Sequence, residues 1–182
     1  MKIFNRMLVG FIALFALFDG AKAWSGPFAD ETRMGDMFMV MAPAYAFGMT
    51  MMEDGYEGSI QFAEVLISTQ LATEGIKALK LEERPNKHDK KSFPSGHAAG
   101  AFSGAMFVHK RYGWKPALIP YAMSIITSYT RIDTKAHYFH DTVAGAAVAG
   151  LFTWLLVDEY MPKGVSVNAD PNGVSVGFKT SF

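Results

Sequence analysis

Residues 94–108 read PSGHAAGAFSGAMFV, and this stretch predicts a helix that packs closely against other helices. Pro94 followed by the hydroxyl of Ser95 is typical of a helix start, because serine caps the first free N–H groups. The rest of the stretch is rich in alanine and glycine. Gly100 and Gly104 lie four residues apart, which permits another helix to approach one face closely. The sequence therefore favours a packed helical bundle.

Four further stretches on either side of this one are predicted to be helical: residues 37–52, 59–79, 117–129 and 138–157. The second of them carries Glu64, Gln70 and Glu74 on an amphipathic pattern. The other three contain uncharged runs of 16, 13 and 16 residues. Because a membrane span needs about 20 apolar residues, both a membrane bundle and a soluble bundle stay open at this point.

The two ends of the chain differ in character from this helical centre. Residues 1–23 have basic residues, a short apolar run and a small-x-small site, which predicts a secretory signal peptide or else an uncleaved anchor. Residues 163–182 alternate apolar and polar side chains around Asp170-Pro171-Asn172-Gly173, which predicts a β-hairpin. The expected fold is all-α, a bundle of about five to six helices in residues 24–162 with a short C-terminal β-hairpin.

Composition excludes several classes of function. The chain has 17 basic and 17 acidic residues, so no excess of positive charge favours nucleic acid as a partner. It contains no cysteine, which rules out disulfides, zinc–thiolate sites, iron–sulfur clusters and thiol nucleophiles. The mean hydropathy of +0.12 is high for a soluble protein but low for a chain made only of apolar spans.

Three groups of polar residues between positions 77 and 141 indicate a functional site. They are Lys77 followed by Arg84-Pro85, then Pro94-Ser95-Gly96-His97, and finally Thr130-Arg131 followed by His137 and Asp141. Each group alone has an ordinary structural interpretation as solvated loop charges, a helix start, or a pair one turn apart on a helix surface. Their joint occurrence in this order and spacing makes a shared site the better interpretation.

In order and spacing the three groups resemble the signature of the type 2 phosphatidic acid phosphatase superfamily. That superfamily also includes bacterial acid phosphatases and vanadium haloperoxidases. One position departs from the usual pattern, since Thr130 stands where the family usually has serine. Both side chains carry a hydroxyl, so the departure changes little.

The residue types fit phosphate chemistry, because charge in phosphoryl transfer spreads over oxygens that need positioned cations and N–H donors. Each arginine can offer a planar fork to two oxygens, and the N–H groups at a helix start attract an anion. The resemblance implies that the phosphate is held by Lys77, Arg84, Ser95, Gly96 and Arg131. No metal or cofactor is expected.

Two histidines and one aspartate are the expected catalytic residues. Asp141 can take the proton on one ring nitrogen of His137, which leaves the other nitrogen free to attack phosphorus. The resemblance implies that His137 is the nucleophile, that Asp141 orients it, and that His97 protonates the leaving oxygen and then activates water. The other histidines, His88, His109 and His140, are interpreted as bystanders, and His140 is expected to point away from Asp141.

The leading hypothesis is a phosphatase that acts on a phosphorylated or pyrophosphorylated lipid, with its site at the periplasmic face of a bacterial inner membrane. A phosphorylated lipid and the membrane are the expected partners, and the oligomeric state is left open. The alternatives are a soluble periplasmic acid phosphatase, a vanadate-dependent haloperoxidase and a non-catalytic anion-binding envelope protein.

Overall fold

A computed structural model describes residues 31–160, 165–170 and 173–178. The signal peptide predicted for residues 1–23 lies outside the described residues. So does the predicted boundary between the helical domain and the tail at residues 162 and 163.

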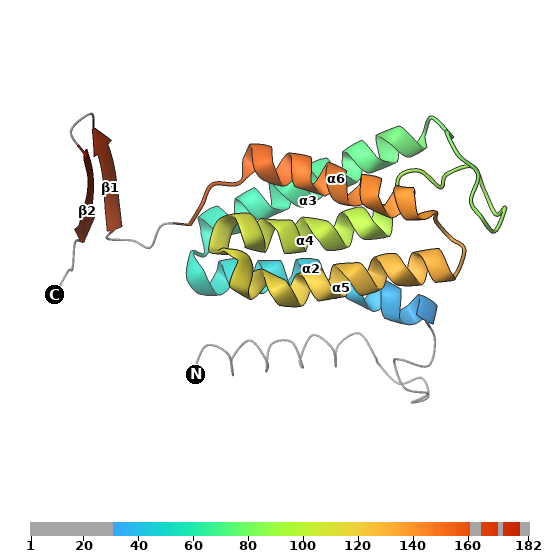
Figure 1. Ribbon diagram of the computed structural model, residues 1–182, viewed down its shortest axis with the longest axis horizontal. Coiled ribbons are helices and arrows are strands. Elements are labelled where there is room, and N and C mark those ends of the chain that lie inside the picture. Colours follow the sequence, from blue (N-terminus) through green and yellow to red (C-terminus); the bar gives the residue numbers. More distant parts are fainter. Residues whose placement is uncertain (1–30, 161–164, 171–172, 179–182) are drawn as a thin grey trace.

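Five helices make up the main body of the described residues: α2 (Glu31–Glu53), α3 (Tyr56–Lys77), α4 (Gly96–Tyr112), α5 (Trp114–Asp133) and α6 (Phe139–Leu156). Each overlaps one of the predicted helical stretches, so the expected helical bundle is confirmed. Helix α4 lies in the middle and contacts all four others. Figure 1 shows α3 and α6 on one side of it and α2 and α5 on the other.

Small residues allow α4 to occupy this central position. A Cβ built on Gly104 would lie 2.5 Å from the carbonyl oxygen of Ala42 in α2, so the two backbones are in direct contact. Gly145 of α6 is equally close to α4, because a Cβ there would lie 2.5 Å from the carbonyl oxygen of Ser95. Most residues of α4 are buried as a result. The close approach predicted from glycine spacing is confirmed at Gly104.

A buried arginine links several segments at the end of the bundle where α4 meets α5. Arg111 donates through Nε to Oδ2 of Asp54 at 2.5 Å and through Nη1 to Oε1 of Gln61 at 2.7 Å. Its Nη1 also donates to the carbonyl oxygen of Asp158 at 3.1 Å. These contacts tie the end of α4 to the α2–α3 turn, to α3 and to the chain after α6.

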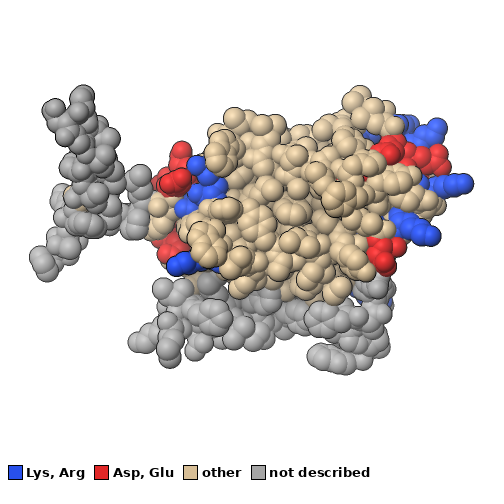
Figure 2. Space-filling model, viewed as in Figure 1, with Lys and Arg blue, Asp and Glu red and all other residues tan. Residues whose placement is uncertain are grey.

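One face of the bundle is apolar between two charged ends. On the face drawn in Figure 2, lysine, arginine and acidic side chains gather at the two ends and the middle is almost free of them. Large apolar side chains exposed on α3, α5 and α6 include Ile67, Leu71, Leu118, Ile125, Leu151, Trp154 and Leu155. Within the described residues, α6 is the helix that is long and apolar enough to cross a membrane.

Residues near the C-terminus form two strands, β1 (Val165–Asp170) and β2 (Gly173–Phe178). They pair antiparallel, with Val165 opposite Phe178 and Asp170 opposite Gly173. Residues 171–172, where the sequence predicts the turn, lie outside the described residues. The turn itself therefore stays a prediction.

The contact at Gly104 predicts that Gly104→Ala destabilises the bundle by about 1–3 kcal/mol, the usual cost of overpacking. The new methyl group has a backbone oxygen as its neighbour, which cannot swing aside. Gly48→Ala in α2 is the matched control, because nothing lies within 4 Å of the added Cβ. Denaturant unfolding in detergent should show a loss for the first variant only. Equal stability of both variants would contradict the close α2–α4 contact.

Candidate active site

The structure brings the predicted site residues to one end of the bundle. They come from the end of α3 (Lys77), the connection that follows it (Arg84), the start of α4 (Ser95, Gly96 and His97), the last turn of α5 (Arg131) and the start of α6 (His137 and Asp141). Because neighbouring helices run in alternating directions, these segments meet at the same end. The basic segment of residues 109–115, which contains the end of α4, Gly113 and the start of α5, lies at the opposite end.

Asp141 is fully buried and joins three segments of the site. Its Oδ2 accepts a hydrogen bond from the hydroxyl of Ser92 at 2.5 Å and another from the backbone N–H of Tyr138 at 2.8 Å. Its carbonyl oxygen accepts from the backbone N–H of Ser95 at 2.9 Å. The side chain thus caps α6, while the main chain fixes the start of α4 against it.

His137 does not belong to a helix, so the alternative interpretation of His137 and Asp141 as a pair one turn apart on a helix surface is wrong. Tyr138 is the extended N-cap residue of α6, and the side chain of Asp141 holds its N–H. The backbone N–H of His137 instead donates to the carbonyl oxygen of Arg131 at 3.0 Å. The end of α5 therefore sets where the His137 ring lies.

The contacts of the His137 ring fix its tautomer. Nη1 of Arg84 lies 3.2 Å from Nε2 of His137, and a guanidinium can only donate. Nε2 therefore carries the lone pair and Nδ1 carries the hydrogen. Nδ1 lies 3.4 Å from Oδ2 of Asp141 and makes no hydrogen bond in the described structure. The nitrogen with the free electron pair faces the arginine, and the protonated nitrogen faces the carboxylate.

Burial first, and then the positive charge of Arg84, lower the pKa of His137 to about 4. The ring is therefore neutral at pH 7 and its Nε2 keeps a lone pair available for bonding. Arg84 is itself held in place, because Nη1 donates to the carbonyl oxygen of Ala136 at 3.1 Å and Nε donates to Asp89 at 2.8 Å. The hydrogen bond from Arg84 lowers the pKa of Asp89 to about 2, so this pair stays charged.

Lys77 and the start of α4 approach each other closely. A Cβ built on Gly96 would lie 2.8 Å from Nζ of Lys77, so glycine leaves room for the ammonium group. Lys77 pairs with Glu74 at 3.1 Å on its own helix. Ser95 is the N-cap of α4, and its hydroxyl accepts from the N–H of Ala98 at 3.4 Å. The first N–H groups of the helix have no partner within it, which favours an anion there.

Asp36 of α2 joins the remaining two predicted residues. Its Oδ1 lies 2.9 Å from Nε2 of His97 and also accepts a hydrogen bond from Nη2 of Arg131. Arg131 is almost fully buried, whereas the side chain of Asp36 is about half exposed. Asp36 and Ser92 could not be identified from the sequence, because neither lies in a recognisable motif and each joins the site only through folding.

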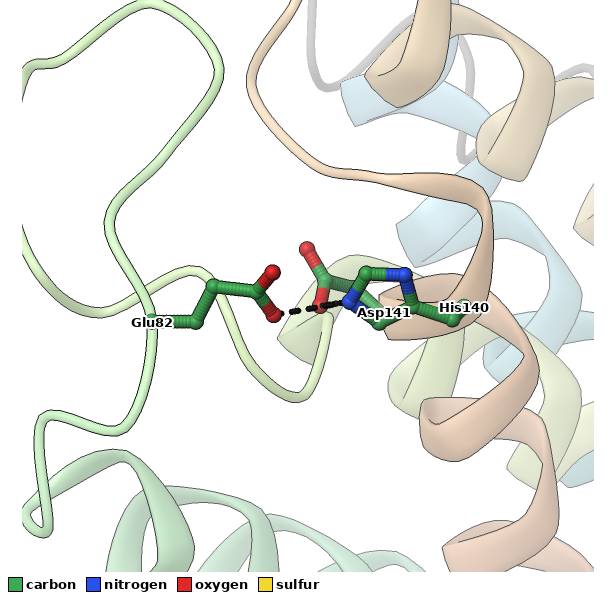
Figure 3. Close-up of side chains that lie close together, drawn as sticks. All are labelled: Glu82, His140 and Asp141. Atoms are coloured by element: carbon green, nitrogen blue, oxygen red, sulfur yellow. Dashed lines mark hydrogen bonds and ion pairs between the residues drawn. The ribbon is translucent and has the colours of Figure 1, made fainter.

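His140 lies beside the site rather than pointing away from it, so that expectation is also wrong. Figure 3 shows both carboxylates on the same side of its ring, with Nε2 2.7 Å from Oε2 of Glu82 and 3.3 Å from Oδ1 of Asp141. These are the described residues that could hold a metal ion, since their ligand atoms lie within 4.8 Å of one another. In the present arrangement Nε2 of His140 is hydrogen-bonded to Glu82 and faces the Asp141 carboxylate without a hydrogen bond to it.

Comparison with known proteins agrees with the residue pattern. A family model described as the PAP2 superfamily matches residues 61–162, which is more than half of the chain. The chain is 42% identical over 81 residues to a lipid A 4'-phosphatase of Helicobacter pylori, a match that covers 44% of this chain and 41% of the relative. It is 35% identical over 68 residues to a lipid A 1-phosphatase of Porphyromonas gingivalis, covering 36% of this chain and 15% of the relative.

These matches span less than half the length of either curated relative. No solved structure matches the chain with statistical significance.

The contact between Arg84 and His137 predicts that Arg84→Gln raises the pKa of His137. The variant removes the neighbouring positive charge, which is the second largest cause of the shift, and burial keeps the value below the ordinary 6.5. Histidine NMR titration measures this directly. Lys87→Gln is the control, because it removes an exposed positive charge from the same loop without touching the ring. An unchanged pKa in Arg84→Gln would contradict the described contact.

Proposed function

The chain belongs to the PAP2 superfamily, and on that premise we propose that it is a metal-independent phosphatase acting on a phosphorylated or pyrophosphorylated lipid through a phosphohistidine intermediate. One observation carries the proposal: the buried, neutral ring of His137 presents its lone pair beside the Arg84 guanidinium. A nucleophile whose free electron pair lies next to a phosphate-binding cation is what an in-line attack on phosphorus requires.

In the first step Nε2 of His137 attacks phosphorus, so that an N–P bond forms and the bond to the leaving oxygen breaks. His97 gives its proton to that oxygen. The ring of His137 gains positive charge as the N–P bond forms, and the Asp141 carboxylate, 3.4 Å from Nδ1, stabilises it. Before this attack, as the phosphate binds, Arg84 exchanges its contact with Nε2 for a contact with a phosphate oxygen, which frees the lone pair of Nε2.

In the second step a water molecule attacks the phosphoryl group on His137. His97, now deprotonated, accepts a proton from this water, the N–P bond breaks, and inorganic phosphate leaves. The negative charge on the phosphoryl oxygens is balanced in both steps by Lys77, Arg84, Arg131 and the N–H groups that follow Ser95 and Gly96. These groups supply the positive charge that bound metal ions provide in other phosphoryl-transfer sites.

A lipid substrate is supported by the surface around the site. Apolar side chains exposed on several helices leave a continuous apolar zone between the charged ends on the face shown in Figure 2. The helices contain 17 to 23 residues, which at 1.5 Å per residue is roughly 25–35 Å and comparable to the hydrocarbon thickness of a bilayer. The named activities of the two relatives make a phosphate group of lipid A the first substrate to test.

We place the site at the periplasmic face of the inner membrane. This orientation follows from the export signal predicted for residues 1–23, which leads into α2, and α2 begins at the site end of the bundle. The alternative is a soluble periplasmic acid phosphatase. It is favoured by the finding that among the described helices α6 alone meets the length and hydropathy expected of a span.

The proposal predicts phosphate release from phosphorylated lipid A or undecaprenyl pyrophosphate by carbonate-washed membranes that contain the protein, in the presence of EDTA. His137→Ala should abolish release, because the proposed N–P bond forms on His137. His88→Ala is the matched control, since this exposed histidine lies outside the site. Activity found only in the carbonate supernatant would support the soluble alternative, and full activity of His137→Ala would refute the mechanism.

A further inference from the structure

Asp36 makes two contacts that are unusual for a carboxylate in an anion site. The same oxygen, Oδ1, lies against Nη2 of Arg131 and against Nε2 of His97. In the proposed mechanism Arg131 binds a phosphate oxygen, and His97 faces the oxygen of the leaving group. The carboxylate oxygen therefore lies where oxygens of the substrate or product are expected. The argument that follows rests on the proposed function.

A phosphate and a carboxylate cannot share these two donors without a large cost. Two unit charges about 4 Å apart repel by roughly 4 kcal/mol at the effective dielectric of a protein surface. The Asp36 side chain can turn away from a bound phosphate, because it is 52% exposed and lies on the outer part of the site. Arg131, by contrast, has 7% of its side chain exposed, so it stays in place when the carboxylate leaves.

Asp36 also lies outside the segment that carries the family pattern. The matched region starts at residue 61, whereas Asp36 is in the second turn of α2. Gly35 keeps this turn close to α5, because a Cβ there would lie 2.0 Å from Oγ1 of Thr130 and 3.0 Å from Nη2 of Arg131. The close approach of α2 to the end of α5 is therefore what brings the Asp36 carboxylate to the site.

We propose that Asp36 is a positioning residue that occupies the place of a phosphate oxygen in the empty site and competes with product phosphate for Arg131 and His97. In the empty enzyme it holds both donors in the arrangement that a phosphate requires. During turnover the returning carboxylate helps to expel inorganic phosphate, so that product inhibition stays weak.

The test is the affinity for inorganic phosphate of the full-length protein in detergent. Asp36→Asn and Asp36→Ala should bind phosphate about tenfold more tightly, which corresponds to about 1.4 kcal/mol. Affinity is measured as phosphate-dependent protection against thermal unfolding, which needs no turnover, and as the competitive inhibition constant with a lipid substrate. Asp133→Asn is the matched control, because it removes an exposed acidic charge near the same end of α5.

The direction in which the phosphate affinity of the Asp36 variants changes separates the proposed role from a purely structural one. Damage to the site would weaken phosphate binding, whereas loss of a competing carboxylate strengthens it. Unchanged or weaker binding in both Asp36 variants would overturn the proposal, and so would equal strengthening in Asp133→Asn. Tighter phosphate binding in a protein that hydrolyses no lipid would support competition between Asp36 and phosphate but refute the proposed function.

Discussion

The geometry of the site depends on one fully buried carboxylate, that of Asp141. A buried charge is costly unless hydrogen bonds compensate for it, and loss of one partner of a buried ion commonly costs about 3–5 kcal/mol. The oxygen Oδ2 of Asp141 accepts hydrogen bonds from the hydroxyl of Ser92 and the N–H of Tyr138. Because these partners lie on different segments, the side chain fixes the loop before α4 and the start of α6 relative to one another, with Nδ1 of His137 3.4 Å from the same oxygen.

Close helix packing makes that arrangement possible. Gly145 lets the second turn of α6 approach the carbonyl oxygen of Ser95, which brings Asp141 within reach of the start of α4. Gly104 allows α2 to approach α4 closely farther along that helix. Helix α2 in turn carries Asp36 to the other side of the site. The small residues that give α4 its central place therefore also decide which polar groups can meet at the end of the bundle.

Much of this could be predicted from the sequence. The helices followed from apolar runs and periodicity, because these patterns reflect burial directly. The observed α2 begins earlier than predicted, at Glu31 rather than Met37, since its first turns carry charges that the apolar run excludes. Motif spacing identified the eight proposed site residues, from Lys77 to Asp141, because the family pattern lies in short segments of the chain.

The rest depends on contacts between distant segments, which sequence spacing does not reveal. No sequence pattern marks Ser92 or Asp36 as a site residue. Folding places Ser92 beside Asp141 and Asp36 beside Arg131. The tautomer of His137 could not be inferred either, because it is set by Arg84, 53 residues away. The spacing of His137 and Asp141 was misleading, since four residues equal one helical turn only when both residues are helical.

The central claim is that His137 becomes phosphorylated during turnover. The most direct measurement is rapid mixing with a phosphorylated lipid, quenching in alkali where phosphohistidine survives, and mass spectrometry of the peptide that contains residue 137. We expect one phosphoryl group on His137, which appears within the first turnover and disappears as substrate is exhausted. Continued release of phosphate with no phosphoryl group on His137, or with the group on another residue, would contradict it.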